Sequence, residues 1–387
     1  MPSLPDVAIR RILMTADTVG GVWTYALELA RALQSYAIDV VLATMGTPLN
    51  EQQRTAVQQI ANITLCESAW KLEWMEKPWD DVAAAGAWLL ELEALTQPDI
   101  VHLNGYTHGV LPWKSPTLIV GHSCVLSWFA AVKGTAPPTD WERYQQEVRR
   151  GLHAADLVTA PTEAMLTALH THYGDFRAAP VVYNGLQMSH FPPLAKQPYI
   201  LTAGRMWDEA KNIAVLAHVA PQLSWPVLAA GEERHPEGGA VRFDTVQQLG
   251  KLAPAELALW LGHAAIFALP ARYEPFGLTV LEAGLAGCAL VLGDIPSLRE
   301  VWDGAALFVP PDQPDALAEA LEHLIQDDWW REIMAQRARA RALRYTPARM
   351  AHAYVRLYAK LKCVGTPEQL AKTSIMQGSP KTRMVAE

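Results

Sequence analysis

Two glutamates, Glu274 and Glu282, lie eight residues apart in the otherwise apolar segment RYEPFGLTVLEAG. The preceding AIFALP reads as a buried strand and LTVLEAGLAG as a helix, so Glu274 is expected in the loop at the carboxyl end of the strand. Ligands bind at that edge of doubly wound sheets, and Gly277 lets the chain turn tightly beside a ligand. The pair therefore suggests that one ligand meets both carboxylates. Alternatively, Glu274 is an exposed loop charge and Glu282 complements the helix dipole.

Two cations, Arg205 and Lys211, follow another predicted strand in the segment AGRMWDEAKN. A forked guanidinium and a compact ammonium ahead of a helix could clamp a pyrophosphate. The alternative is that Asp208 and Glu209 occupy both cations in local salt bridges. A third strand end carries Gly20 and Gly21, in TADTVGGVWTYALELA, where backbone N–H groups at a helix start favour an anion. This segment matches neither G-x-G-x-x-G nor the P-loop pattern, so a plain tight turn is the alternative.

Length and composition indicate two globular domains. The 387 residues exceed what a single core usually supports, and half of them are hydrophobic. The net charge is −8, and the acidic excess lies almost entirely in residues 1–190. This distribution argues against nucleic acid as a partner and against attraction of the first domain to an anionic membrane surface, because phosphate binding draws on clustered Lys and Arg. Four scattered cysteines form no C-x-x-C pair, which suggests neither a zinc site nor a disulfide framework.

The elements that must position these residues follow a repeating order. Strand-like runs such as IDVVLATM and TLIVGHS alternate with helix-like runs such as WTYALELARALQSY, first up to about residue 185 and again from YILTAGR onward. Alternation of this kind is typical of parallel sheets with crossover helices. We predict an α/β chain of two doubly wound domains. Residues 329–362 read as one or two long helices broken near YTP.

The motifs together resemble the retaining glycosyltransferases of family 4. The most specific part is E-P-F-G-L-x-x-x-E followed by A-G-L-A-G-C-A-L-V, and the G-R-x-x-x-x-x-K-N and glycine-pair segments occur in the matching order. The resemblance covers residues 10 to about 360. It implies a GT-B fold, in which two Rossmann-like domains face each other across a cleft that holds a nucleotide sugar. Prolines at 192, 193 and 198 indicate a linker at 186–198, and the polar, uneven residues 363–387 read as a loose tail. The resemblance then implies an acceptor-side domain 1–185, a nucleotide-sugar-binding domain 199–343 and a helix at 344–362 that crosses back to the first domain.

The resemblance also implies roles for single residues. Glu274 would contact hydroxyls of the donor sugar, and Glu282 would accept hydrogen bonds from the ribose. Arg205 and Lys211 would hold the pyrophosphate and stabilise the leaving nucleotide diphosphate. Backbone amides close to the sugar and phosphates would come from Phe276, Gly277 and Leu278 on one side and from Gly20 and Gly21 on the other.

Two histidines follow strands of the first domain. His122, in TLIVGHSCVLSW, matches the position of a family active-site His near the donor sugar, whereas His102 lies in D-I-V-H-L-N instead of the usual H-x-H. For both, lining the cleft or filling buried structure is the alternative. No H-E-x-x-H or D-x-D motif occurs, so we expect no required metal or other cofactor.

The resemblance implies front-face transfer of a sugar, with retention and without metal, to an acceptor hydroxyl. UDP is the favoured donor nucleotide and GDP the next; the connection LGKLAP at 249–254 is expected to read the base. The acceptor is a saccharide, a small molecule or a lipid-linked glycan. An epimerase of the same fold and a non-catalytic nucleotide-sugar-binding protein are the alternatives. Because no run of about 18 apolar residues or signal peptide is evident, we expect a cytoplasmic protein, with peripheral attachment to the inner face of a membrane also open.

Three further segments have structural interpretations. S-L-R-E at 297–300 is predicted as a capping box, in which Ser297 starts a helix and Glu300 returns the bond. Asn184-Gly185 is predicted as a turn. Trp70, Trp74 and Trp79 are interpreted either as packing against the first domain or as an aromatic platform for an acceptor sugar.

Overall fold

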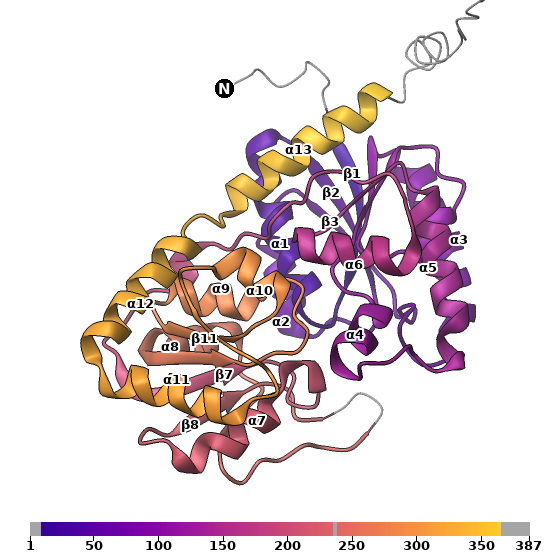
Figure 1. The fold of residues 1–387 in the computed structure, drawn as a ribbon. Helices are drawn as coiled ribbons and strands as arrows, with labels where there is room; N and C mark the ends of the chain where they lie inside the picture. Colours follow the sequence, from indigo (N-terminus) through magenta and orange to yellow (C-terminus); the bar gives the residue numbers. More distant parts are fainter. Residues whose placement is uncertain (1–8, 235–237, 365–387) are drawn as a thin grey trace, which may run out of the picture.

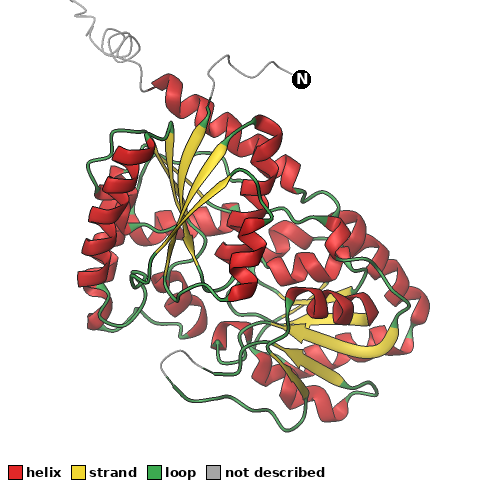
Figure 2. Cartoon of the chain, turned by 180° about the vertical axis from the view of Figure 1, so that it is seen from behind, coloured by secondary structure: helices red, strands yellow, loops and turns green. Residues whose placement is uncertain are grey.

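The computed structural model describes residues 9–234 and 238–364. These residues form two α/β units, each built on its own six-stranded sheet with helices on both faces (Figure 1; Figure 2 gives the view from behind). This arrangement confirms the predicted fold of two Rossmann-like, doubly wound domains.

The first sheet is wholly parallel and has the strand order β3-β2-β1-β4-β5-β6. Its strands are β1 (Arg11–Asp17), β2 (Asp39–Met45), β3 (Ile63–Glu67), β4 (Ile100–Leu103), β5 (Thr117–Val120) and β6 (Leu157–Thr159). β1 is buried from Ile12 to Ala16 without a break. A strand covered on both faces needs such a continuous apolar run, which explains why the segment reads RILMTAD and does not alternate.

Helices cover both faces of this sheet. They are α1 (Gly21–Leu33), α2 (Glu51–Gln58), α3 (Trp79–Thr96), α4 (Val125–Val132), α5 (Glu142–Ala154) and α6 (Glu163–Tyr173). Short 3-10 turns are η1 (Gln34–Tyr36), η2 (Thr107–Val110), η3 (Thr139–Trp141) and η4 (Met188–His190). In α1, Tyr25, Leu29 and Leu33 recur every four residues and are buried. This spacing places them on one helical face against the sheet.

The second sheet is also parallel, in the order β12-β11-β10-β7-β8-β9. Its strands are β7 (Gln197–Ala203), β8 (Val227–Ala230), β9 (Gln247–Gly250), β10 (Ala264–Leu269), β11 (Ala289–Gly293) and β12 (Leu307–Val309). Its helices are α7 (Ile213–Val219), α8 (Pro254–His263), α9 (Leu278–Leu285), α10 (Pro296–Trp302), α11 (Pro314–Gln326) and α12 (Asp328–Ala342), with 3-10 turns η5 (Glu209–Lys211) and η6 (Ala220–Gln222). Strand β7 begins at Gln197, inside the predicted linker. The alternation of strands and helices that builds the second domain therefore begins at Gln197.

The last described helix, α13 (Pro347–Val364), packs on the first domain although it follows the second in sequence (Figure 1). Its apolar face, which includes Met350, Tyr354 and Tyr358, is buried in the same core as β1 and α1. The predicted break near YTP is confirmed, because α12 ends at Ala342 and α13 starts at Pro347. The predicted tail lies outside the described residues from 365 onward.

The predicted turn at Asn184-Gly185 is wrong. The backbone forms no turn there and passes against the returning chain at Thr346 and Pro347. A Cβ on Gly185 would lie 2.3 Å from the carbonyl of Thr346. The glycine is therefore required for close approach of the two chain crossings between the domains, not for a reversal.

Within residues 9–234 and 238–364, no helix combines the length and the apolar character that a bilayer crossing requires.

Candidate active site at the domain boundary

Loops after strands of the two sheets contact each other directly. Trp128 Nε1 of α4 donates to Asp208 Oδ1 at 3.1 Å. The backbone N–H of Cys124 donates to Tyr273 Oη at 3.1 Å, and Thr162 Oγ1 donates to the Pro275 carbonyl at 2.8 Å. Parallel strands place all their carboxyl ends on one edge, which brings these loops, and the predicted site residues within them, to a common boundary.

Lys211 and Glu274 form the most buried ion pair of the predicted site. Their Nζ and Oε2 atoms are 2.5 Å apart, and the side chains retain 15% and 12% exposure. Glu274 Oε1 also accepts from the backbone N–H of Gly277 at 3.1 Å, and Ser297 Oγ donates to the Glu274 carbonyl at 2.5 Å. The lysine at the end of η5 and the glutamate after β10 are thus held in one position by bonds from three segments.

Arg205 lies beside Asp208, as the alternative interpretation of this segment anticipated. Its Nη2 is 2.7 Å from Asp208 Oδ2, and its guanidinium lies over the Trp207 ring at 5.1 Å. Burial alone would raise the pKa of Asp208, but the charges of Arg205 and Lys211 and the bonds from Trp128 and Ala210 hold it below its usual value. The side chain of Arg205 is 40% exposed, so the cation is positioned by its partner and still accessible.

The predicted glycines adopt the conformations that such turns need. Gly20 precedes α1 with φ 91°, and Gly277 precedes α9 with φ 86°, which is left-handed backbone that favours glycine. A Cβ on Gly21 would lie 3.1 Å from Cδ1 of Leu278, the first residue of α9. The starts of helices from opposite domains therefore face each other. The side chain of Phe276 is buried in the core of the second domain, so a ligand could meet this residue only through its backbone, as the predicted amide contact requires.

Glu282 lies in the second turn of α9, and its side chain forms no hydrogen bond or ion pair with residues 9–234 or 238–364. Its side chain is half-buried, and Oε2 is shielded from solvent with no donor in reach among the described residues. Burial raises the pKa of Glu282 to about 8. A carboxyl in this state favours hydroxyl or amine donors that arrive with a ligand, because an unsatisfied buried acceptor costs free energy. The two glutamates therefore differ: Glu274 is ion-paired with Lys211, whereas Glu282 has no cationic partner among the described residues.

His122 is neutral and fixed by an amide. Burial lowers its pKa to about 3, and its ring packs edge-on against Tyr25 at 4.5 Å between centroids. Its Nε2 is 2.9 Å from Asn104 Oδ1, while Asn104 Nδ2 donates to the Thr15 carbonyl at 2.7 Å. The amide orientation makes Nε2 the donor, so Nδ1 is left as an acceptor. The structure thus places a hydrogen-bond acceptor after β5 of the first domain.

His102 has a structural position. It is fully buried in β4, and its two ring nitrogens lie 3.1 Å from Tyr25 Oη and 2.6 Å from Tyr358 Oη. Burial lowers its pKa to about 3. Because Tyr358 belongs to α13, this histidine connects the first sheet to the returning helix.

Asp17, at the end of β1, was missed by the sequence interpretation. Its Oδ1 accepts from the Val19 N–H at 2.6 Å. Burial raises the pKa of Asp17 to about 7, although the Val19 bond and the charge of Arg205 in the other domain favour the ionised form. Glu274 was located because it is a polar residue at the end of a buried strand. The same rule applied to the end of RILMTAD would have located Asp17.

The predicted capping box at 297–300 is wrong. Helix α10 begins at Pro296, Ser297 bonds the Glu274 carbonyl, and Glu300 does not return to its own helix. Its carboxylate instead accepts from the backbone N–H groups of Glu163 and Ala164, at 2.8 and 2.9 Å. These groups start α6 of the first domain, where negative charge is favoured by the helix dipole. Both residues of the supposed cap thus serve the domain boundary.

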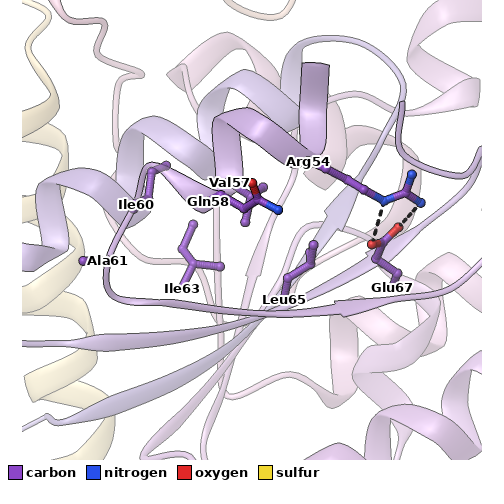
Figure 3. Close-up of a pocket in the computed structure, with 8 residues that line it drawn as sticks. All are labelled: Arg54, Val57, Gln58, Ile60, Ala61, Ile63, Leu65 and Glu67. Carbon is purple, nitrogen blue, oxygen red and sulfur yellow. Dashed lines mark hydrogen bonds and ion pairs between the residues drawn. The ribbon is translucent and has the colours of Figure 1, made fainter. Parts of the chain in front are cut away.

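Two surface hollows lie on the first domain. One, of about 370 Å³, lies between α2 and β3; it is mainly apolar and has the Arg54–Glu67 ion pair at one end (Figure 3). The second, of about 460 Å³, is lined by Trp70 and Trp88 together with polar residues that include Asp81. Trp74 and Trp79 pack against the core near α5 and β5, as the packing interpretation expects.

Two family models match the chain in succession. The model described as Glycosyltransferase Family 4 matches residues 19–190, and the model described as Glycosyl transferases group 1 matches residues 197–327. The chain is 30% identical over 171 residues to an O-antigen chain mannosyltransferase B of Escherichia coli, a match that covers 40% of this chain and 43% of the relative. It is 26% identical over 379 residues to a D-inositol 3-phosphate glycosyltransferase of Jonesia denitrificans, covering 84% and 88%.

Solved structures share the fold at low identity. Sucrose-phosphate synthase from Thermosynechococcus elongatus superimposes with a TM-score of 0.78 at 18% identity, covering 92% of this chain and all of the other. HepE of Anabaena, solved in complex with UDP and glucose, has a TM-score of 0.68 at 15% identity, with 95% and 100% covered. At these identities the likeness establishes the two-domain architecture.

Proposed function

Because this chain belongs to the family 4 glycosyltransferases and has their GT-B architecture, we propose that it transfers a hexosyl group from a nucleotide sugar to an acceptor hydroxyl with retention of configuration. The observation that carries the proposal is the Lys211–Glu274 pair, with Arg205 beside it, at strand ends that face the start of α1. A diphosphate needs fixed cations, and a sugar needs fixed acceptors. Lys211 supplies the cation and Glu274 the acceptor, and the two side chains are in direct contact.

The donor would lie with its diphosphate between Arg205, Lys211 and the amides that start α1 at Gly20 and Gly21. Diphosphate oxygens then compete with Asp208 and Glu274 for the two cations, and the freed Glu274 oxygen accepts from a sugar hydroxyl. Glu282, whose Oε2 lacks a donor among the described residues, accepts from the ribose hydroxyls. The donor would thus replace existing partners of Arg205, Lys211 and Glu274, and it would supply the hydrogen-bond donor that Glu282 Oε2 lacks among the described residues.

Transfer would take place on the front face of the sugar. As the glycosidic bond breaks, negative charge grows on the departing diphosphate, and the two cations stabilise it there. The departing phosphate oxygen helps to take the proton of the acceptor hydroxyl, while the neutral His122 accepts from a donor hydroxyl through Nδ1. Since Arg205 and Lys211 already supply positive charge at the leaving group, we propose that no metal ion is required.

We propose UDP as the donor nucleotide and GDP as the next candidate. HepE binds UDP-glucose in one of its solved complexes, and several relatives are mannosyltransferases. For the acceptor, relatives named for inositol 3-phosphate, phosphatidyl-myo-inositol and a diphospho-undecaprenol glycan support a polyol or a lipid-linked saccharide. The hollow lined by Trp70 and Trp88 is a candidate surface for such an acceptor, because sugar faces pack on aromatic rings.

A thermal-shift series with UDP, GDP, ADP and their sugar conjugates tests the donor site, with Glu282→Ala as the control. Stabilisation by one nucleotide that is lost in the variant supports the assignment and identifies the base. Equal stabilisation of both proteins would place the nucleotide elsewhere, and no shift with any compound would favour a binding protein for another ligand.

Transfer is distinguished from epimerisation by the products. Release of free nucleoside diphosphate that depends on an added acceptor indicates transfer, whereas a new nucleotide sugar formed without acceptor indicates an epimerase. The anomeric coupling constant of the product, measured by NMR, then tests retention directly.

A further inference from the structure

Residues 329–364, which comprise most of α12 and all of α13, concentrate positive charge. This segment contains nine of the 32 Lys and Arg of the chain and one of its 40 Asp and Glu, Glu332. Its net charge is therefore +8 in a protein whose total is −8. The comparison of residues 1–190 with the rest of the chain did not reveal this positive segment, because acidic residues elsewhere in the second half balance its charge.

Helix α13 separates its residues by face. The apolar face is buried against the first domain, as described above. The opposite face is exposed and carries Arg349, His352, Arg356 and Lys360, spaced by three or four residues. Side chains with this spacing lie in one row along a helix, so the row points to solvent over the length of α13.

Helix α12 continues the exposed cations onto the second domain. Arg337 and Arg339 are exposed on the helix, and Arg344 follows its end. Among them lie two exposed apolar side chains, Trp329 at 69% and Leu343 at 41% exposure. Both helices run along the same side of the molecule (Figure 1).

These cations have no acidic partner. We define the cationic strip as Arg337, Arg339, Arg344, Arg349, Arg356 and Lys360; in the part of the chain that the structure describes, none of the six forms an ion pair. Other arginines of α12 are used internally: Arg341 donates to the carbonyls of Val301 and Asp303, and Arg331 to that of Leu324. Within the strip, Arg349 Nη1 donates to the Arg344 carbonyl at 3.0 Å and the Arg337 guanidinium lies over the Trp330 ring at 5.6 Å. These contacts leave the positive charges without an acidic counterpart among the described residues.

We propose that the cationic strip docks the protein on a membrane surface rich in anionic phospholipids. The two helices are about 22 Å and about 27 Å long at 1.5 Å per residue, so the strip is extended and suits a surface better than a single small anion. Clustered Lys and Arg bind anionic leaflets additively, and Trp and Leu among them suit the headgroup boundary. A nucleic acid would use the cations but leave Trp329 and Leu343 without a role.

Docking through this strip would determine the location of the protein, and the proposal does not depend on the proposed donor site. Because α12 belongs to the second domain and α13 packs on the first, the same surface would hold both domains. None of the six cations has been placed at the donor site.

Vesicle sedimentation with the full chain tests the proposal. We expect binding to vesicles that contain phosphatidylglycerol beside phosphatidylcholine, no binding to phosphatidylcholine alone, and weakening by salt, because exposed charges are screened. The triple variant Arg349→Glu, Arg356→Glu, Lys360→Glu should bind at least about tenfold more weakly. A second triple variant at Arg337, Arg339 and Arg344 tests the same strip if the first one folds poorly.

The matched control is Arg149→Glu, Arg177→Glu, Arg242→Glu, which changes three exposed cations elsewhere by the same charge. It should retain nearly all binding. Absence of binding to anionic vesicles, or equal losses in the control and strip variants, would overturn the proposal. So would strip-dependent binding of duplex DNA without any binding to vesicles, which would make nucleic acid the occupant.

Discussion

The carboxyl ends of the two sheets differ in chemistry although both sheets are parallel and six-stranded. The end of the second sheet is charged, with Arg205 beside Asp208 and Lys211 beside Glu274. Each cation there is paired with an acid of the same domain. Charge is therefore held in place before any ligand arrives, and only a stronger anion can displace the partner.

In the first sheet, the groups at the ends of β1, β4 and β5 carry little charge. His122 has its pKa lowered to about 3, its partner Asn104 is an amide, and burial raises the pKa of the nearby Asp17 to about 7. His122 is fixed by a hydrogen bond to the Asn104 amide, and Asn104 and Asp17 are fixed by hydrogen bonds with backbone groups, so no ion pair is needed. The comparison suggests a division of work in the proposed reaction: the second domain stabilises the charge of the leaving group, and the first domain orients uncharged hydroxyls.

Removal of the Lys211 side chain should lower turnover more than any other change described below, because it takes away one of the two cations of the second domain. We expect Lys211→Ala to lower kcat by about 10²- to 10³-fold, the range for loss of one group that stabilises developing charge, and to leave Glu274 buried without its cation. Nucleoside diphosphate release under saturating donor measures it. A kcat within twofold of the wild type would remove the lysine from the proposed mechanism.

Glu282 should lose its extra proton when the donor binds. With a pKa of about 8 the carboxyl is mostly protonated at pH 7, and ribose hydroxyls that donate to it favour the ionised form. Calorimetry in buffers of different ionisation enthalpy should show release of roughly 0.9 proton at pH 7. Glu282→Gln should abolish the release and weaken UDP binding about tenfold or more, whereas the exposed Glu319→Gln should do neither.

The same group affects stability. Its pKa is about 8 in the folded protein against 4.5 for an ordinary glutamate, so the folded state holds a proton that the unfolded state has released. Stability should therefore fall as pH rises from about 4.5 to 8. Denaturant unfolding of Glu282→Gln should show a shallower decline over this window; an unchanged slope would mean that the carboxyl is ionised at neutral pH.

Tyr358→Phe should affect stability but not catalysis. It deprives the buried His102 of a hydrogen bond from α13, and we expect a loss of about 1–2 kcal/mol in the free energy of unfolding with kcat within twofold. Tyr36→Phe is a matched control, because Tyr36 also bonds a histidine between the first domain and α13 but at an exposed position, 3.4 Å from His352 Nδ1. Equal losses in both variants would contradict the importance of the buried network.

Lys133→Ala should have the smallest effect. Lys133 and Glu209 pair across the domain boundary at 2.6 Å, but both side chains are substantially exposed. Pairs of this kind contribute roughly 0–1 kcal/mol. Both kcat and the free energy of unfolding should stay close to wild type, in contrast to the buried lysine pair. A tenfold fall in kcat would show that contacts between the domains limit turnover.

The sequence predicts the alternation of strands and helices, and with it the strand ends where Arg205, Lys211 and Glu274 lie, because each element is encoded by local apolar periodicity. It also offers Asp208 as a partner of Arg205, since the two are three residues apart. Local pattern is sufficient wherever the contact is within one loop.

Partners distant in sequence could not be predicted in this way. Tyr358 bonds His102 from 256 residues away, and Glu300 bonds the start of α6 from 137. A capping-box pattern at 297–300 and an Asn-Gly pair at 184–185 both match local rules, yet in each case a contact from the other domain or from the returning chain determines the structure. The unpartnered state of Glu282 is equally invisible to sequence, since it depends on what surrounds α9.

The return of α13 to the first domain has a consequence for synthesis. The core formed by β1 and α1 is completed by a helix that is translated only after the whole second domain. At about 5–20 residues per second, the 161 residues between Gly185 and Pro347 take roughly 8 to 30 s to emerge from the ribosome. During that interval the nascent first domain exposes the apolar surface that Met350, Tyr354 and Tyr358 later cover, so the emerging chain offers a binding surface to chaperones until α13 is made.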